Sequence, residues 1–302
     1  MSRIVFVAFL AGCGVTTPIA VTDAGSTLPV DAGSTGPMDA GSDAGMTLVD
    51  AGVVDTDAGV PRCSFYDSKV NCPPVITPLL GRDVYWQFPS SPAPDGGFPA
   101  VIIYQGSLFA PASAWGEVPS SAVFGGFHQA RLHALLLEHG FTVITPSALG
   151  GIAWQTNSGL PWDTTSDKTF IDGLLDALRT GTFGPVNMSR LYASGISSGG
   201  YMTSRMAVSY PGVFRALVIH SGSYATCAGV ACFLPATLPA QHPPTRFLHG
   251  RSDFTVPLYT AEQYEQALVA QSFEADIFID DAAGHEWLSL APEKILEWFQ
   301  AH

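Results

Sequence analysis

The chain has 302 residues, 47% of them hydrophobic, which is enough to bury one large core. Its formal net charge is -13 and it has no run of Lys and Arg. A nucleic acid is therefore excluded as the expected partner, because phosphate backbones need a basic surface. The composition changes near residue 62, so we expect one folded domain over residues 63–302, preceded by two segments of a different kind.

Residues 1–13 have the pattern of an export signal. Arg3 supplies a positive charge, Ile4–Leu10 is an apolar run too short to span a bilayer, and small residues follow. The run ends in LAGC, which resembles a bacterial lipobox and predicts a signal peptide with lipidation of Cys13. We expect a membrane contact only through that lipid anchor. An ordinary signal peptide with an incidental Cys13 is the alternative, and the chain is then a secreted protein rather than an outer-membrane lipoprotein.

Residues 14–62 form a low-complexity segment. The tripeptide Asp-Ala-Gly occurs six times at irregular spacing, aromatic residues are absent, and seven Asp face one base, Arg62. Such a segment cannot bury enough surface to offset its loss of conformational entropy. We expect a disordered tether that holds the next domain away from a membrane. Its Asp and Gly residues lack the nonapeptide pattern of calcium-binding repeats, so calcium is not expected.

Short apolar runs alternate with helical patterns through the rest of the chain. The predicted strands are residues 83–88, 100–106, 141–146, 189–196, 214–222, 245–250 and 274–280. The predicted helices are residues 127–140, 166–181, 197–211, 259–273 and 291–302. This alternation predicts an α/β fold with a mostly parallel central sheet and helices on both faces. Ligands bind such sheets beyond the carboxyl ends of the strands, so we expect the chemistry there.

Four cysteines remain in the expected domain: Cys63, Cys72, Cys227 and Cys232. Their spacings do not form a CxxC motif and no histidines cluster with them, which disfavours zinc. An even number of cysteines in an exported protein favours disulfides. Three connectivities are possible, and local pairing of Cys63 with Cys72 and of Cys227 with Cys232 is the simplest. We expect no metal and no cofactor.

A Gly- and Ser-rich turn joins the strand 189–196 to the helix that follows it. Residues 195–199, GISSG, fit the motif G-x-S-x-G at the strand–helix junction that this motif requires. Its glycines remove Cβ atoms that would collide in a sharp turn, and the turn exposes the hydroxyl of Ser197. The helix behind it directs N–H groups and a dipole at the reacting centre. A plain Gly/Ser loop is the alternative, but in this context the motif predicts Ser197 as a nucleophile.

A serine hydroxyl needs a base that takes its proton. Of the eight histidines, His285 fits best because it follows the last predicted strand, and in sheets of this type the histidine comes last in chain order. The acid is expected between the two, and Asp253 follows the strand 245–250. It would orient the imidazole and stabilise the imidazolium. Asp280 and Asp281 lie too close to His285 in sequence to approach it from a separate strand.

A tetrahedral oxyanion needs preorganised hydrogen-bond donors. We expect one to be the backbone N–H of Ser198, the residue after the nucleophile. The loop after the strand 100–106 is expected to give the other, through the N–H of Ser107, positioned by Gln105 and Gly106.

Tryptophans lie in two loops on the expected active side. Trp115 follows the loop of Ser107, and Trp154 and Trp162 lie in a Gly-rich insert between a strand and a helix. We expect all three to line an apolar groove for the substrate, together with Phe109, Leu149, Ile152 and Leu160. Core packing is the alternative for any single aromatic residue.

Three stretches together resemble the extracellular depolymerases of medium-chain-length polyhydroxyalkanoates, which are bacterial storage polyesters. They are SGISSGGYMTSRMAVSYPGVFRALVIHSGSYATC, HPPTRFLHGRSDFTVP and GGIAWQTNSG, and the likeness extends over most of residues 63–302. The resemblance implies an α/β-hydrolase fold, a triad of Ser197, Asp253 and His285, and hydrolysis of poly(3-hydroxyoctanoate)-like esters through an acyl-enzyme. The tether and the lipobox are not expected of this family.

Three hypotheses follow for the function. The first is an extracellular serine esterase that degrades a hydrophobic polyester. The second is an esterase of broader specificity for polyesters or for small esters such as feruloyl conjugates. The third is an inactive hydrolase fold that serves as a binding lipoprotein, which the intact order of serine, acid and histidine disfavours. A peptidase is a further option, since a triad also cleaves amides, but nothing in the sequence marks a pocket for a peptide side chain.

Overall fold

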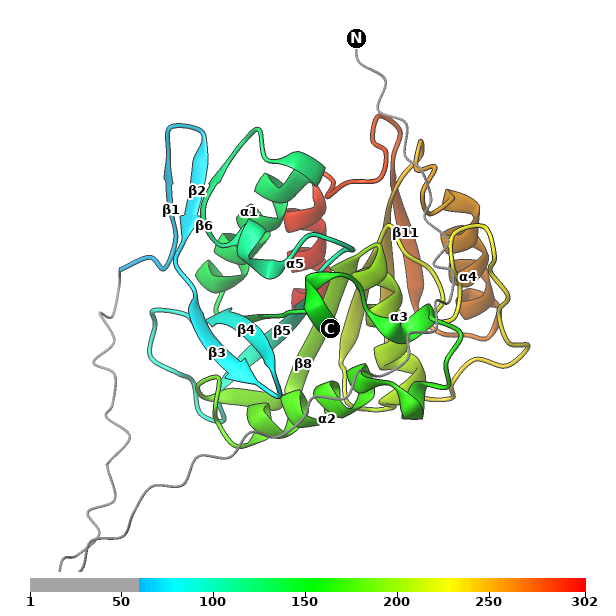
Figure 1. The fold of residues 1–302 in the computed structure, drawn as a ribbon, viewed down its shortest axis with the longest axis horizontal. Coiled ribbons are helices and arrows are strands. Elements are labelled where there is room, and N and C mark those ends of the chain that lie inside the picture. Colours follow the sequence, from blue (N-terminus) through cyan, green and yellow to red (C-terminus); the bar gives the residue numbers. More distant parts are fainter. Residues whose placement is uncertain (1–59) are drawn as a thin grey trace, which may run out of the picture. The chain divides into compact units, whose positions relative to one another are not determined.

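The computed structural model describes residues 60–302 (Figure 1). The predicted signal peptide, Cys13 and the predicted tether up to residue 59 lie outside this range. At the end of the predicted tether, Arg62 donates from Nε to Phe88 O at 3.2 Å, and its guanidinium carbon lies 5.0 Å from the Phe88 ring centroid. The packed part of the chain therefore already includes Arg62.

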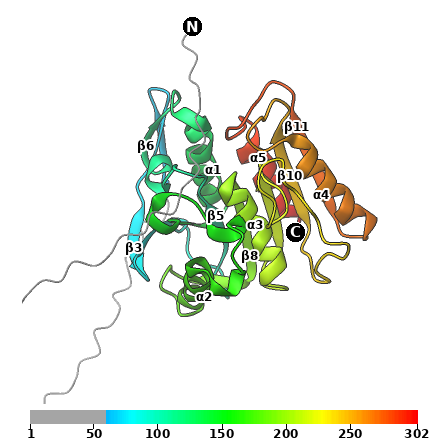
Figure 2. The same cartoon turned by 45° about the vertical axis from the view of Figure 1, so that its right-hand side comes forward.

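An eight-stranded sheet has the order β11-β10-β9-β8-β5-β7-β4-β3 (Figures 1 and 2). Its strands are β3 (Val75–Leu79), β4 (Arg82–Gln87), β5 (Phe98–Tyr104), β7 (Thr142–Pro146), β8 (Val186–Ile196), β9 (Ala216–His220), β10 (Thr245–Gly250) and β11 (Ala275–Asp280). The six strands from β11 to β7 are parallel to one another, and β4 and β3 pair antiparallel at one edge. The predicted, mostly parallel sheet is confirmed.

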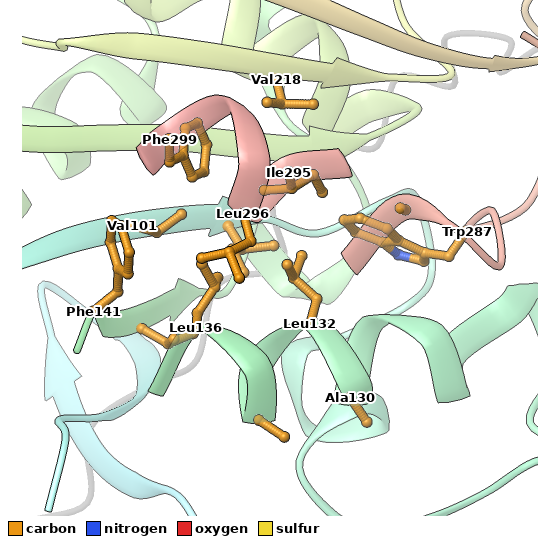
Figure 3. Close-up of a cluster of buried hydrophobic side chains, with 14 of the residues drawn as sticks. Val101, Ala130, Leu132, Leu136, Phe141, Val218, Trp287, Ile295, Leu296 and Phe299 are labelled. Atoms are coloured by element: carbon orange, nitrogen blue, oxygen red, sulfur yellow. The ribbon is translucent and has the colours of Figure 1, made fainter. Parts of the chain in front are cut away.

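Helices cover both faces of this sheet. They are α1 (Gly126–Glu138), α2 (Ser166–Arg179), α3 (Ser198–Ser209), α4 (Leu258–Ala270) and α5 (Ala291–Ala301). Every residue of β5 is buried, and its side chains alternate between two hydrophobic clusters because successive residues of a strand face opposite sides. The cluster that contains Val101 packs against α1 and α5, as Figure 3 shows for Leu132, Leu136 and Leu296. The opposite face is covered by α2, α3 and α4.

A three-stranded antiparallel sheet was not predicted. It has the order β1-β2-β6 and consists of β1 (Ser64–Tyr66), β2 (Lys69–Cys72) and β6 (Gly116–Pro119). The disulfide Cys63–Cys72 connects the residue before β1 to the end of β2. A second disulfide, Cys227–Cys232, closes a short loop between β9 and β10. Both disulfides confirm the predicted local pairing.

Short 3₁₀ helices occupy the loops before α1 and α2. They are η1 (Pro111–Ala114), η2 (Val123–Gly125), η3 (Leu149–Gly151), η4 (Gln155–Asn157) and η5 (Trp162–Thr164). Within residues 60–302, no helix is both long and apolar enough to cross a membrane. The same residues contain no group of three His, Cys, Asp or Glu side chains placed to hold a metal ion.

Candidate active site

Ser197 lies in the turn between β8 and α3. Its φ of 57° and ψ of -118° are values that residues with a side chain rarely adopt. The Ser197 N–H donates to His220 O at 3.0 Å, and the Ser197 carbonyl accepts from the N–H of Tyr201 at 3.0 Å. These two bonds fix the turn to β9 and to the first turn of α3. The Ser197 side chain is half-buried at the carboxyl edge of the sheet.

Glycines allow the backbone to pass closely at this turn. A Cβ on Gly195 would lie 2.6 Å from Gly199 O, and a Cβ on Gly199 would lie 2.7 Å from Gln105 O. A Cβ on Gly200 would lie 2.7 Å from His220 O. Such distances are shorter than van der Waals contact, so only glycine fits at these three positions. The predicted role of the glycines in the motif is confirmed.

Asp253 and His285 meet beyond the ends of β10 and β11. The His285 Nδ1 lies 2.7 Å from Asp253 Oδ2, and the carboxylate side chain is fully buried. The other carboxylate oxygen accepts the N–H groups of Thr255 and Val256 at 2.9 and 2.8 Å. Asp253 is therefore oriented by its own loop, and His285 receives its partner on Nδ1. The Nε2 of His285 is left for a partner on the other side of the ring.

A second histidine contacts the same carboxylate from the buried side. The Nε2 of His249 lies 2.8 Å from Val256 O and 3.4 Å from Asp253 Oδ2, and its side chain is fully buried. Burial by itself raises the pKa of the Asp253 carboxyl, but hydrogen bonds from His249 and His285 hold this pKa well below its usual range. The carboxylate therefore stays ionised and can stabilise an imidazolium at His285.

His220 connects the serine turn to the histidine loop. Its carbonyl accepts from Ser197 N, while its imidazole Nε2 accepts from the N–H of Leu288 at 3.0 Å. Burial, and then the nearby His249 and His285, lower the pKa of His220 well below its usual value. A neutral ring matches the geometry, because Nε2 can accept the Leu288 N–H only when it carries no proton. No hydrogen bond joins Ser197 to His285 directly among the described residues, and such bonds often tighten only with substrate bound.

Of the two predicted oxyanion donors, Ser198 directly follows Ser197 at the start of α3 and Ser107 lies in the loop after β5. A Cβ on Gly106 would lie 3.8 Å from the Cβ of Ser197, which places the start of this loop beside the nucleophile. The N–H of Leu108 donates to Ile152 O at 2.7 Å, whereas the N–H of Ser107 has no backbone acceptor in the described part of the chain. Ser198 is the first residue of α3, where N–H groups lack intrahelical partners. The roles of Ser107 and Ser198 stay predictions.

Two of the three predicted substrate tryptophans are core residues, and that prediction is wrong for them. Trp115 is 4% exposed and donates from Nε1 to Thr145 Oγ1 at 2.6 Å. Trp154 is 3% exposed and donates from Nε1 to Gln105 O at 3.2 Å. Internal acceptors satisfy both indoles, so both rings pack inside. Trp162 is half-buried with the Arg205 guanidinium 5.3 Å from its ring centroid, and its substrate contact stays a prediction.

Other apolar side chains lie in the loop that begins beside Ser197 and next to the ring of His285. Leu108 is 75% exposed and Ile152 60% exposed, and the bond from Leu108 N to Ile152 O holds their backbones together. The Phe124 ring centroid lies 5.8 Å from the His285 ring and 4.2 Å from that of Phe109. We call Leu108, Phe109, Phe124 and Ile152 the acyl rim. The sequence prediction included Phe109 and Ile152 but not Leu108, whose position directly after Ser107 was the available signal.

Comparisons with known proteins agree with this arrangement. The model of the prolyl oligopeptidase family matches residues 129–230. The chain is 45% identical over 250 residues to the poly(3-hydroxyoctanoate) depolymerase of Pseudomonas fluorescens, covering 80% of this chain and 89% of that protein. It is 54% identical to feruloyl esterase B of Thermothelomyces thermophilus over 43 residues, which are 14% of this chain and 15% of that protein.

The solved structures show the fold. A thermostable esterase superposes with a TM-score of 0.54 at 14% identity, over 76% of this chain and 62% of its own. At this identity the likeness concerns the architecture alone. Together with the family match, it assigns the sheet, the covering helices and the serine turn to the α/β-hydrolase fold.

Proposed function

Because this chain belongs to the family of the poly(3-hydroxyoctanoate) depolymerases, serine ester hydrolases with the α/β-hydrolase fold, we propose that it hydrolyses medium-chain-length polyhydroxyalkanoates. The observation that carries the proposal is the 2.7 Å contact between Asp253 and His285, in a chain whose Ser197 lies in a strained strand–helix turn. These features support Ser197 as the nucleophile, His285 as the base and Asp253 as the orienting acid.

In the proposed first half-reaction, Ser197 Oγ attacks the carbonyl carbon of an ester. Its proton passes to Nε2 of His285, since Nδ1 of that ring is bound to Asp253. The oxyanion that forms accepts hydrogen bonds from the N–H groups of Ser198 and Ser107. His285 then protonates the alcohol oxygen of the ester as the bond between that oxygen and the carbonyl carbon breaks. Ser197 is left acylated, and the part of the polyester with the new hydroxyl end is released.

Water completes the cycle in the second half-reaction. His285 takes a proton from a water molecule, and the resulting hydroxide attacks the acyl carbon. The same N–H donors stabilise the second oxyanion. When the bond to Ser197 Oγ breaks, His285 returns its proton to that oxygen, and a hydroxyacid or a shortened chain with a free carboxylate leaves the site.

The acyl rim supports an apolar acyl side chain. Leu108 and Ile152 are among the large apolar residues of this chain that stay exposed, and they flank the loop of the second oxyanion donor. An alkyl side chain that lies against them leaves water, which contributes about 0.8 kcal/mol for each CH₂ buried. We therefore propose that the rim favours medium-length alkyl side chains over short ones.

We also propose that the protein works outside the cytoplasm. Two disulfides are consistent with an oxidising compartment. The export signal and the lipobox cysteine Cys13 belong to the residues outside the described range, so secretion and lipid anchoring rest on their sequence pattern.

A second candidate is an esterase for small aromatic esters. The 43-residue match to feruloyl esterase B supports it, but this match covers a small part of either protein. The ratio of the rates on emulsified poly(3-hydroxyoctanoate) and on methyl ferulate distinguishes the two candidates. A ratio in favour of methyl ferulate would replace the polyester proposal.

The variant Ser197→Ala tests the nucleophile. We expect kcat on a soluble p-nitrophenyl ester to fall by about 10⁴-fold or more, because the nucleophile is lost while substrate binding remains. We also expect a fluorophosphonate probe to label Ser197 in the wild type and to leave the variant unlabelled, as mass spectrometry of the tryptic peptides would show. The control is Ser209→Ala at the end of the same helix. Retained activity in Ser197→Ala, or labelling of another serine, would reject the mechanism.

A further inference from the structure

One long segment of this chain contains no ionisable carboxylate, amine or guanidinium. Residues 216–245, which form β9 and the connection to β10, have no Asp, Glu, Lys or Arg. The whole chain has 13 Lys and Arg and 26 Asp and Glu, with a formal net charge of -13. A buried strand explains the first five of these residues, but the connection that follows is a surface segment with many exposed residues. This connection therefore presents a surface without formal charges to solvent.

Large apolar side chains on and beside this connection face solvent. Val230 is 75% exposed and Phe233 is 86% exposed, one inside the Cys227–Cys232 disulfide loop and one directly after it. Phe254, which follows Asp253 in the chain, is 93% exposed. Folded proteins bury most phenylalanine side chains, and a group of exposed ones marks a contact surface. We call Val230, Phe233 and Phe254 the apolar patch.

The disulfide loop is held rigidly. Ala228 and Ala231 exchange two backbone hydrogen bonds, at 2.8 and 3.0 Å, inside the ring that the disulfide closes. The hydroxyl of Tyr259 donates to Val230 O at 3.1 Å, which anchors the loop to α4. A preorganised surface loses little conformational entropy when it adsorbs. Most of the free energy gained by burying its apolar residues therefore remains as binding free energy.

The same loop lies beside the candidate active site. The N–H of Gly229 donates to the hydroxyl of Tyr201, four residues after Ser197 on α3, at 3.2 Å. A Cβ on Gly229 would lie 3.5 Å from Thr255 O, in the loop that orients Asp253. The patch is thus attached to both elements that supply the nucleophile and the acid. It is distinct from the acyl rim, whose residues come from the loops after β5, β6 and β7.

We propose that the apolar patch is the surface by which this protein adsorbs to solid polyester. The inference rests on the proposed function and adds to it the place where the polymer is held. An uncharged, rigid, apolar surface suits a water-insoluble aliphatic polymer, which offers many CH₂ groups and no ions. A soluble protein partner would instead be recognised with charged and hydrogen-bonding groups around an apolar centre. Adsorption through this patch keeps ester bonds near Ser197 after each cleavage.

The test is the double variant Phe233→Ser with Phe254→Ser. Adsorption is measured in the Ser197→Ala background, by depletion of the protein from a suspension of poly(3-hydroxyoctanoate) particles, so that hydrolysis does not consume the polymer. Each phenyl group that no longer leaves water weakens adsorption by about tenfold or more. We expect the double variant, which lacks two phenyl groups, to bind about a hundredfold more weakly. With Ser197 intact, we expect kcat/KM on a soluble p-nitrophenyl ester to stay within about twofold of the wild type.

Phe65→Ser is the matched control. Phe65 is 61% exposed on β1. Figures 1 and 2 show that the small sheet, which contains β1, lies on the opposite side of the folded domain from α4. We expect the Phe65→Ser variant to adsorb to the polymer as strongly as the wild type. Thermal unfolding of each variant shows whether it is folded, and Val230→Ser serves as a second patch variant should the double variant be unstable.

Each outcome decides the proposal. Unchanged adsorption of the patch variants, or equal loss in Phe65→Ser, overturns it. A parallel loss of soluble-ester activity in a folded patch variant also overturns it, because the patch would then act on the catalytic centre. If the wild type adsorbs through the patch but hydrolyses no polymer, the proposed function fails while the adsorption surface stands.

Discussion

Ser197 keeps a backbone conformation that costs roughly 1–3 kcal/mol in a residue with a side chain. The surrounding backbone enforces it, because Ser197 N–H is bound to His220 O while the Ser197 carbonyl is already part of α3. The turn brings Gly199 so close to Tyr104 and Gln105 that no side chain fits there. Strain at this residue is therefore a feature of the site rather than a defect of the fold.

The variant Gly199→Ala tests how tightly this turn is packed. Its new Cβ would collide with the carbonyl group of Tyr104 and lie 2.7 Å from Gln105 O, and neither backbone group can move without shifting β5. We expect the free energy of unfolding to fall by about 3 kcal/mol or more, measured by urea denaturation. Ser197→Ala changes the same turn without adding an atom, so its unfolding midpoint should stay close to that of the wild type. Equal midpoints for Gly199→Ala and the wild type would contradict this packing.

Single residues differ in how far the sequence predicts them. Ser197 was located because the motif and its strand–helix context fix a backbone shape, which the glycine contacts confirm. Asp253 and His285 were found by chain order and lie in contact, while their catalytic roles stay predictions. Trp115 and Trp154 were misplaced because residue type does not tell whether a loop side chain turns inward. Only the structure provides the buried acceptors of their indole N–H groups.

At the scale of elements, a buried ion pair joins the antiparallel edge of the sheet to α2. Arg82 at the start of β4 and Asp167 in the first turn of α2 lie 2.6 Å apart, with side chains 4% and 0% exposed. The guanidinium carbon also lies 4.4 Å from the Phe170 ring centroid. Asp167 accepts the backbone N–H of Gln155, so the pair also fixes η4 in the insert that contains Trp154. One ion pair thus positions three elements behind the candidate active site.

The variant Asp167→Asn leaves the Arg82 cation buried without its counterion. We expect it to lower the free energy of unfolding by about 3–5 kcal/mol, the usual effect of removing one partner of a buried pair. Urea denaturation followed by tryptophan fluorescence measures the change. Asp176→Asn on the same helix breaks the exposed pair with Arg179 and should leave the midpoint almost unchanged. Equal changes in the free energy of unfolding for Asp167→Asn and Asp176→Asn would show that the buried pair stabilises the fold no more than the exposed pair does.

The strands that the sequence predicts are those with a long apolar run. The predicted strands 100–106 and 245–250 overlap β5 and β10, whose residues are mostly buried, so the apolar run and the core position agree. β1 was missed because it has three residues, all exposed. β3 was missed because Pro78 interrupts its pattern, and it is tolerated there because β3 is an edge strand. Short edge strands depend on their partners rather than on their own composition, so a local pattern does not reveal them.

At the scale of the whole molecule, three histidines are buried in separate parts of the core. His133 packs against Trp115, His220 against Trp287, and His242 against Tyr264. Burial lowers the pKa of His133 to about 3 and that of His242 to about 4, and it lowers the pKa of His220 well below its usual value. All three rings are therefore neutral in the folded protein at neutral pH, and each would have to be charged in an acid-unfolded chain.

These three histidines predict acid sensitivity of the fold. Their folded-state pKa values lie below the unfolded value of 6.5. The folded protein therefore keeps its full free energy of unfolding above about pH 6.5 and loses part of it as the pH falls toward 4 and 3. Near pH 5 the unfolded chain binds about two more protons at His133 and His242, so these two rings should lower stability by roughly 3 kcal/mol per pH unit, and His220 acts in the same direction. Urea denaturation between pH 7 and pH 4.5 measures this slope. His242→Gln removes one titrating ring and should lower the slope by roughly 1 kcal/mol per pH unit, whatever its effect at neutral pH. A stability that stays constant from pH 6.5 to pH 5 would mean that these rings take up protons without unfolding the core.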